Sequence, residues 1–296
     1  MIQNKTFGSR LFTVINTVLL ILMGLLCLLP VLHVFALSLS SSNAVSAGSV
    51  LFWPVQFTLS SYEFAMKDPQ FLRSFGISIL RVLAGVLVNV VMTVITAYPL
   101  SRNGKRLHGR NLYVGYFFLT MLIGGGMIPT YLVVARTGLL DSLWALIIPG
   151  ALPVYYMIIM MNFMRGIPPE LEESAMIDGA GPIQILFRVW LPVLKPSVAT
   201  VTLFCIVGHW NDWFGGLLYM NKTSNYPLQT YLQSLLTNFD ALLKQNSLNY
   251  VELIKRMNAR TGRAAQVFLA AIPLLAIYPF LQKYFTKGLT LGSVKG

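Results

Sequence analysis

The feature that most constrains this chain is a set of long segments without a charged residue. No Asp, Glu, Lys or Arg occurs in residues 11–62, 82–101, 111–135, 142–164 and 264–282. A sixth segment, 196–221, carries a single acid, Asp212. A helix needs about 20 mostly apolar residues to cross the hydrocarbon core of a bilayer. Six such segments in one chain predict an all-α, polytopic membrane protein.

The composition supports this class. Hydrophobic residues make up 55% of the 296 residues and charged residues only 11%, whereas soluble domains carry about 25% charged residues. Two cysteines exclude a disulfide scaffold. We expect the chain, 1–296, to form one transmembrane domain with spans at about residues 11–37, 75–100, 111–134, 142–164, 197–220 and 264–286.

The positive charges give an orientation. Short loops rich in Lys and Arg stay on the cytoplasmic side, and four positive residues follow the second expected span: Arg102, Lys105, Arg106 and Arg110. We therefore expect both termini inside, with outer loops at about 38–72 and 221–263. Anionic lipid headgroups then account for the net charge of +12, and no nucleic-acid partner is needed.

The loop between the fourth and fifth expected spans, about residues 165–192, is too elaborate for a connector, since packed helices are usually joined by 2–8 residues. Two prolines followed by acids predict a helix start at Pro169 and a helix that runs to about Ile177. A Gly-Ala-Gly-Pro break follows at 179–182. A second short helix is expected over 183–190, stopping before Leu191-Pro192.

The motif in this loop is Glu173-Ser174-Ala175, three residues, Gly179-Ala180, and then Leu191-Pro192 twelve positions after Gly179. It resembles the EAA motif of the permeases of binding-protein-dependent ABC importers, with Ser174 where alanine is commonest. The resemblance extends over the whole chain, including the run 209–213 and the residues 287–289. It is strongest to carbohydrate permeases that import oligosaccharides derived from complex polysaccharides such as alginate, rhamnogalacturonan or aldouronate-containing chains.

This resemblance implies a role and a set of partners. The loop would be a coupling helix that docks on a cytoplasmic ATPase, through Glu172, Glu173, Ser174, Ala175, Asp178, Gly179 and Ala180. Gly179 would reverse the chain with positive φ, and the Asp178 side chain would cap that turn. A second permease, two ATPase subunits that bind ATP and Mg²⁺, an extracytoplasmic solute-binding protein and an oligosaccharide are implied, in a bacterial cytoplasmic (inner) membrane.

The chain itself is expected to be a transport subunit without catalytic residues, cofactor or metal, because no Walker motif is present. Its ATP hydrolysis would be supplied by the partner subunits. The triplet at 124–126, followed by Pro129, is no phosphate loop and instead predicts a break in the third span.

Polar residues at membrane depth are candidates for the substrate pathway, because such groups are costly in lipid and usually face a cavity or a partner. They are Arg81, Trp210, Asn211, Asp212 and Trp213. Indole rings beside amide and carboxylate groups suit a sugar; the alternative is a helix-packing cluster. Arg81 either pairs with Asp212 or extends toward the interface. Tyr155 and Tyr156 are expected to be packing residues.

Two other classes remain open from the residues alone. A proton-coupled secondary sugar transporter would use Asp212 and Arg81 as a relay, but it leaves the coupling loop unexplained. An intramembrane enzyme lacks a set of His, Asp or Glu with metal-ligand spacing. Basic residues in the outer loops favour an acidic sugar, and acids there partly offset them, so the sequence leaves the particular oligosaccharide open.

Overall fold

The computed structural model describes residues 7–102, 107–244, 260–277 and 279. These residues form helices and one isolated β-bridge between Ser40 and Phe57, with no strand among them. The chain divides into two compact units, residues 1–71 with 237–271, and residues 72–236 with 272–296. The all-α prediction is therefore confirmed for the part of the chain that the structure describes.

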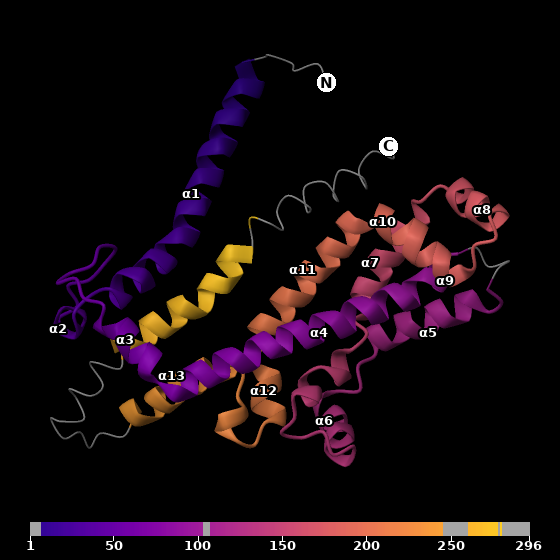
Figure 1. Ribbon diagram of the computed structural model, residues 1–296. Coiled ribbons are helices and arrows are strands. Elements are labelled where there is room, and N and C mark those ends of the chain that lie inside the picture. The colour runs from indigo at the N-terminus through magenta and orange to yellow at the C-terminus, as the bar shows by residue number, and fades with distance from the viewer. Residues whose placement is uncertain (1–6, 103–106, 245–259, 278, 280–296) are drawn as a thin grey trace. The chain divides into compact units, whose positions relative to one another are not determined.

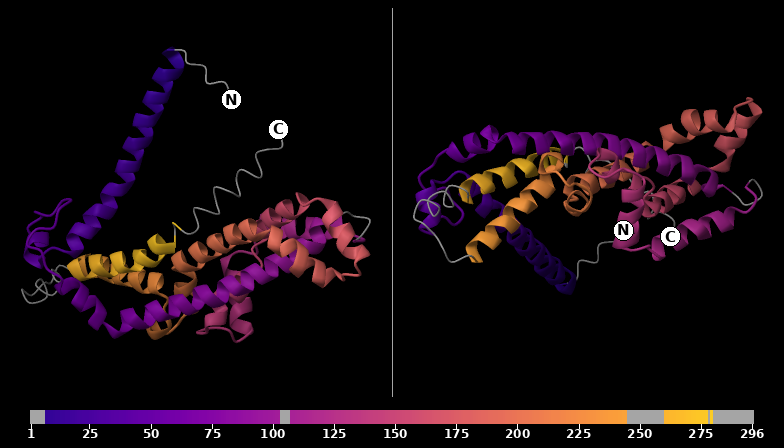
Figure 2. Two further views of the ribbon diagram at one scale, coloured as in Figure 1. Left: turned by 45° about the horizontal axis from the view of Figure 1, so that its top comes forward. Right: turned by 90° about the horizontal axis from the view of Figure 1, so that it is seen from below.

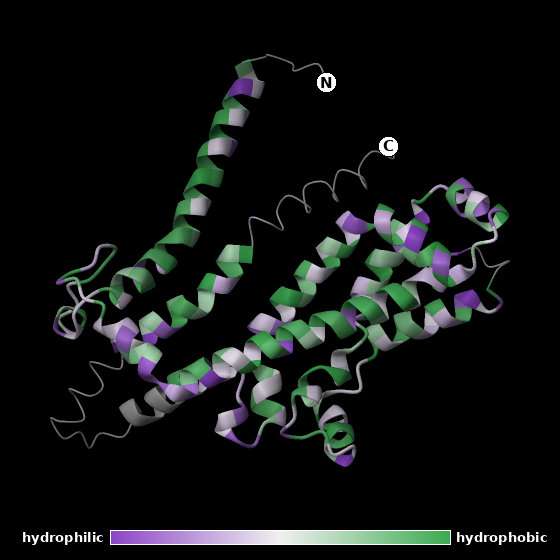
Figure 3. Cartoon of the chain, viewed as in Figure 1, coloured by the Kyte–Doolittle hydropathy of each residue, from purple (hydrophilic) through white to green (hydrophobic). Residues whose placement is uncertain are grey.

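The first unit is built on α1 (Phe7–Ser38), a helix that exposes apolar side chains around its whole circumference (Figure 3). Such a surface is stable in lipid and not in water. Two short helices follow, α2 (Ser42–Ser46) and α3 (Ser60–Lys67). The helical residues 260–271 belong to this unit, and Phe268 packs on Phe35 with ring centroids 4.7 Å apart.

The second unit is organised around α4 (Pro69–Ser101), which runs unbroken along most of the unit's length in both orientations (Figures 1 and 2). Together with α1, α4 is long and apolar enough to cross a membrane. α7 (Val154–Arg165) packs against both α5 (Arg110–Leu122) and α11 (Lys195–Asn211). These four helices carry the cavity described below.

The other expected spans are bent or broken. The third divides into α5 and α6 (Met127–Arg136), which meet at 109° across the predicted break, where Gly126 has φ +85°. The fourth divides into two 3-10 turns, η1 (Leu143–Leu146) and η2 (Ile148–Gly150), and α7, bent by 50°. Between two and five spans are therefore present in the described residues, depending on whether each bent pair counts as one. The sixth expected span lies partly outside them.

The prediction of one continuous helix over 197–220 is wrong. α11 ends at Asn211, Asp212 is extended with φ −73° and ψ 105°, and α12 (Phe214–Tyr219) begins afterwards. The break is stabilised by the Asp212 carboxylate, which accepts a hydrogen bond from the Gly215 N–H at 3.0 Å. A short turn, η4 (Thr223–Asn225), and α13 (Leu228–Lys244) complete the unit.

One hydrophobic core joins the end of α4 to α7, α11 and the segment between them. The buried face of α7 consists of four methionines at helical spacing, Met157, Met160, Met161 and Met164. Leu186 and Trp190 reach the same core from the segment that precedes α11. The expected coupling loop is therefore packed into the helical unit along one side.

Candidate functional site

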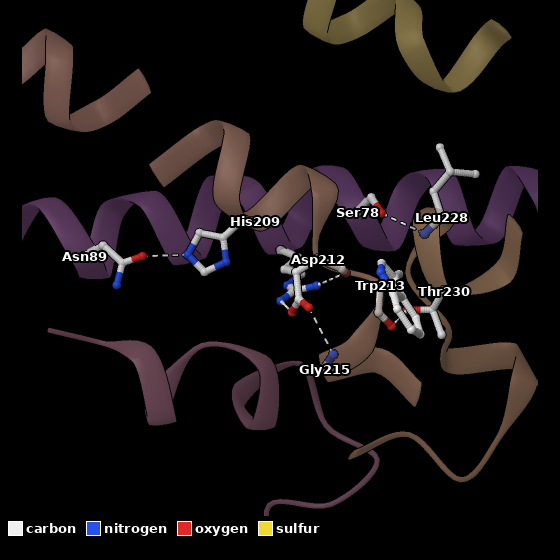
Figure 4. A network of polar contacts seen from close by, with 9 residues as sticks. Ser78, Asn89, His209, Asp212, Trp213, Gly215, Leu228 and Thr230 are labelled. Carbon is white, nitrogen blue, oxygen red and sulfur yellow. Dashed lines mark hydrogen bonds and ion pairs between the residues drawn. The ribbon is translucent and has the colours of Figure 1, made fainter. Parts of the chain in front are cut away.

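A cavity of about 580 Å³ lies between α4, α7 and α11, beside the end of α5. Its volume is within the range of about 300–1,000 Å³ that is typical of small-ligand sites. Polar side chains line it from α4 and α11, namely Arg81, Asn89, His209 and Asp212, and aromatic side chains line it from α7 and α11, namely Tyr155, Tyr156 and Phe204. Figure 4 shows the polar group at the helix break.

Arg81 and Asp212 form an ion pair between α4 and the break after α11. A second guanidinium nitrogen of Arg81 donates to the Asp212 carbonyl oxygen at 2.9 Å. The Arg81 side chain is 3% exposed and that of Asp212 is 37% exposed. Arg81 thus holds the backbone break in place, and both residues of the pair line the cavity, with Asp212 the more exposed of the two.

His209 and Asn89 form the second polar contact, with His209 Nε2 2.6 Å from Asn89 Oδ1 (Figure 4). The amide nitrogen of Asn89 donates to the carbonyl oxygens of Gly150 and Ala151, at 2.6 and 2.9 Å. Because the amide nitrogen is committed to two acceptors, Oδ1 is the acceptor from the histidine. This network ties α4 to α11 and to the turn before α7.

The imidazole of His209 lies directly against α4 at Gly85. A Cβ atom at position 85 would come within 2.5 Å of His209 Nε2. Real Cβ atoms do not approach other heavy atoms so closely, so the histidine occupies space that only glycine leaves open. This contact could not be predicted from the sequence, because a glycine inside an apolar helix has many explanations.

The aromatic wall is formed by three rings. Tyr156 stacks on Phe204 with ring centroids 5.7 Å apart and an interplanar angle of 21°, and Tyr155 meets Tyr156 edge-on at 5.9 Å. The faces of such rings accept apolar C–H groups, and the phenol hydroxyls donate and accept hydrogen bonds. Aromatic faces opposite fixed polar groups suit a ring-shaped, hydroxyl-rich ligand.

The structure divides the five predicted pathway residues. The predicted pairing of Arg81 with Asp212 is confirmed, and both line the cavity. Trp210 is buried and meets Phe75 edge-on at 5.8 Å, away from the lining. Asn211 and Trp213 are exposed and do not line the cavity either.

Tyr156 packs against the hydrophobic core, as expected, and both Tyr155 and Tyr156 also line the cavity. Sequence reasoning also missed His209 and Asn89. Their signal was a histidine and an asparagine inside apolar runs, which costs free energy in lipid unless the groups find partners.

The helix predicted to run to about Ile177 is present as α8 (Pro169–Ile177). It ends in a Schellman motif, in which Ala180 N–H donates to Ala175 O at 2.9 Å and Gly179 N–H donates to Met176 O at 3.0 Å. Gly179 has φ +80°, so the predicted positive φ at this glycine is confirmed. Backbone bonds close this turn, and the Asp178 side chain is exposed beside it.

The second helix of this loop is longer than expected. α9 (Pro182–Gln184), η3 (Ile185–Trp190) and α10 (Leu191–Val193) follow one another without a gap, so Leu191-Pro192 does not end the helical run. The residues of η3 are a π-helix, and Pro192 follows it within the same helical run.

The two predicted coupling glutamates face different surroundings. Glu173 is exposed, whereas Glu172 is buried and forms an ion pair with Arg102, just past the end of α4. A second cavity, of about 530 Å³, lies beside this pair and is lined by Arg110, Arg165 and Trp190 among others. Ser174 and Ala175 lie between the glutamates and the turn, and Ala180 is part of the turn.

An apolar helical unit with a polar-walled cavity and a helix–turn–helix loop fits a membrane transport subunit. Residues 107–291 match the family described as the binding-protein-dependent transport system inner membrane component. The chain belongs to this family, and it is therefore a membrane component of a bacterial ABC transporter.

Individual relatives cover nearly the whole chain. Protein LplC of Bacillus subtilis is 41% identical over 99% of this chain and 98% of its own length. The polygalacturonan/rhamnogalacturonan transport system permease protein YtcP of Bacillus subtilis is 36% identical over 97% of this chain and 99% of its own length. A chain of a bacterial ABC transporter involved in the import of the acidic polysaccharide alginate is 32% identical, with a TM-score of 0.84, covering 95% of this chain and 98% of that chain.

Proposed function

We propose that this chain forms one half of the membrane pathway of an ATP-driven importer for oligosaccharides. It crosses the membrane six times with both termini in the cytoplasm. A second permease completes the pathway, two ATPase subunits bind ATP and Mg²⁺ on the cytoplasmic side, and a solute-binding protein delivers the sugar from outside. Family membership supports each of these partners.

The observation that carries the proposal is the cavity between α4, α7 and α11. It combines three aromatic rings with a charged pair and an amide–imidazole contact whose polar groups already hold one another in place. A preorganised polar wall binds a ligand without first ordering its own side chains. The exposed Asp212 carboxylate accepts hydrogen bonds from sugar hydroxyls, while Arg81 balances its charge.

We further propose that the oligosaccharide carries carboxylates. The names of YtcP and of the alginate transporter support this class, since both polysaccharides are acidic. The ion pair supports it as well, because Arg81 cancels the negative charge that Asp212 would otherwise present to an anionic sugar. Because Arg81 neutralises Asp212, this part of the cavity does not repel the carboxylate of a uronate.

Residues 165–192 are proposed as the coupling loop. α8 presents Glu173 and Ser174 outward, and the Schellman turn at Gly179 returns the chain to the helical unit. Glu173 supplies a charge for the ATPase surface. Ala175 and Ala180 are small enough to allow close approach to it.

The test is uptake by proteoliposomes that contain the complete complex, with the solute-binding protein and ATP supplied. Galacturonate or alginate oligosaccharides should be imported and should stimulate ATP hydrolysis, and neutral galacto-oligosaccharides should do neither. Uptake that needs a proton gradient and no ATPase subunit would overturn the proposal.

A matched pair of variants tests the cavity itself. Tyr156→Ala removes a ring from the wall and should lower uptake several-fold with the complex intact. Tyr116→Ala removes an exposed ring of α5 that does not line the cavity, and should leave uptake unchanged. Equal uptake in both variants would remove the cavity from the pathway.

A further inference from the structure

The ion pair between Arg102 and Glu172 lies at the junction of α4 and the coupling helix. Arg102 Nη1 contacts Glu172 Oε1, and the two side chains are only 12% and 7% exposed. Glu172 and Glu173 are neighbours on a helix with 3.6 residues per turn, so their side chains point about 100° apart. One of them faces the helical unit and the other faces outward.

The arginine is enclosed by two aromatic rings. Its guanidinium carbon lies 4.3 Å from the centroid of the Tyr98 ring and 5.6 Å from that of Trp190, and a guanidinium nitrogen donates to the Tyr98 hydroxyl. The two rings themselves meet edge-on at 5.0 Å. Cation–π contacts of this kind strengthen when water is excluded, so Arg102 is held in one orientation.

The same group reaches the second half of the coupling loop. The Tyr98 hydroxyl donates to the Pro182 carbonyl oxygen at 3.1 Å, at the start of the helical run that leads into α11. Trp190 belongs to the far end of that run. The last turn of α4 is thus joined to α8 through Glu172 and to residues 182–190 through Tyr98 and Trp190.

We propose that Arg102 is a positioning residue that makes the coupling helix and α4 move as one body. The proposal rests on the function proposed above. Separating the buried pair would leave two charges without compensation, which is far more costly than moving both elements together. A displacement that an ATPase imposes on α8 is therefore passed to the end of α4.

α4 can carry that displacement to the cavity. It is one unbroken helix between Arg81 and Ser101, and Asn89 lies about 20 Å from the Arg102 end at 1.5 Å per residue. Arg81 and Asn89 both line the cavity and bond to the end of α11 and to the residues that follow it. Movement of α8 would thus reach the cavity wall through α4.

The first test exchanges the two charges. Arg102→Glu and Glu172→Arg, each alone, place like charges together, and the double variant restores an ion pair with reversed polarity. In assembled wild-type complex, a loaded solute-binding protein stimulates ATP hydrolysis and drives uptake. Each single variant should keep basal hydrolysis and lose sugar transported per ATP by about tenfold, within the range usual for coupling between sites. The double variant should recover most of it.

A purely structural role would lower the amount of assembled complex and leave the ratio of sugar to ATP unchanged in what remains. That result, or a wild-type ratio in both single variants, would overturn the inference. Arg136→Met is the matched control, because Arg136 is exposed on α6. A wild-type complex without ATP-driven uptake would instead refute the proposed function.

A second measurement does not depend on the folding of charge variants. Spin labels at Ile177→Cys on α8 and Leu87→Cys on α4, both exposed positions, report the distance between the two helices. Cys27 is exposed and is first replaced by serine, whereas Cys205 is buried. The label distance should be the same with and without bound ATP, and should broaden or shift with Arg102→Met. If the label distance changed by several ångströms on ATP binding while Arg102 is intact, the inference would be overturned.

Discussion

Arg81 in α4 and Arg102 just past its end both pair with acids from distant segments, and the two pairs differ in their surroundings. Arg81 is buried but its partner Asp212 is 37% exposed and reaches a cavity. Arg102 and Glu172 are both largely buried, under the rings of Tyr98 and Trp190. Both pairs line a cavity, but the side chain of Asp212 is 37% exposed whereas that of Glu172 is only 7% exposed.

This difference separates two uses of an ion pair. A charge that contacts a cavity is solvated by whatever fills it, so its partner can be shared with a substrate. A charge that is largely buried among aromatic rings is costly to separate from its counter-charge. α4 therefore carries a proposed substrate contact at Arg81, and the ion pair that connects it to the coupling loop lies just past its end.

The largest expected loss of stability follows from removing the Trp190 ring that packs beside Arg102. Trp190→Ala removes a side chain that is 5% exposed and packs in the core shared by α4, α7 and α11. It should lower the free energy of unfolding by about 3–5 kcal/mol. Phe204→Ala, in the half-buried cavity wall, should cost clearly less. Denaturant unfolding of the purified complex in detergent compares the two, and equal losses would contradict the distinction.

Neutralising the two acids compares the pairs directly. Glu172→Gln leaves the enclosed Arg102 without its counter-charge and should cost about 3 kcal/mol. Asp212→Asn should cost less, because the Asp212 side chain is 37% exposed and the hydrogen bond from Arg81 to the Asp212 carbonyl remains. The shift in unfolding midpoint measures both. A larger loss with Asp212→Asn would mean that the cavity end is the more rigid of the two.

Adding a methyl group at Gly85, next to His209 in the cavity wall, should lower the stability by a smaller amount. Gly85→Ala places a methyl group 2.5 Å from the His209 ring and should cost about 1–3 kcal/mol through forced repacking. Gly76→Ala, on the same helix, meets no atom within 4 Å and should be neutral or stabilise by up to about 1 kcal/mol. Thermal unfolding in detergent distinguishes them. Tolerance of Gly85→Ala would show that His209 moves freely.

The sequence predicted what depends on neighbouring residues in the chain. The bounds of α8, the positive φ of Gly179 and the break at 124–126 follow from proline, glycine and acids at fixed offsets. Charge-free segments predicted the apolar helices in the same way. The pairing of Arg81 with Asp212 was one of two stated possibilities, because a buried acid needs a cation.

Other features depend on the fold and have no local pattern. The break after Asn211 contains neither glycine nor proline, and it forms because Arg81 binds the Asp212 carbonyl from another helix. Whether Glu172 or Glu173 faces inward depends on Arg102, which lies 70 positions earlier. Tyr155 and Tyr156 were assigned to packing because an aromatic pair in an apolar run fits a core as well as a cavity wall.

The smallest expected effect concerns a third acid, which is held by backbone rather than by arginine. The carboxylate of Asp141 accepts the N–H groups of Lys222 and Asn221, at 3.1 and 2.7 Å. The hydrogen bond from Lys222 is the main cause that lowers the pKa of Asp141 below its ordinary value near 3.8, with that from Asn221 also contributing. These bonds tie the turn before η1 to the turn after α12.

A lowered folded-state pKa means that the carboxylate stabilises the fold above the unfolded-state value, near 3.8, and that this contribution is lost as the pH falls through the folded-state value. Unfolding temperatures of the wild type and of Asp141→Asn, measured between about pH 6 and pH 3, should converge toward the acid end. A constant difference across that range would show that the charge of Asp141 contributes nothing. Convergence would show that the charge of Asp141 stabilises the fold through hydrogen bonds from backbone N–H groups, without an arginine partner and without burial of the carboxylate.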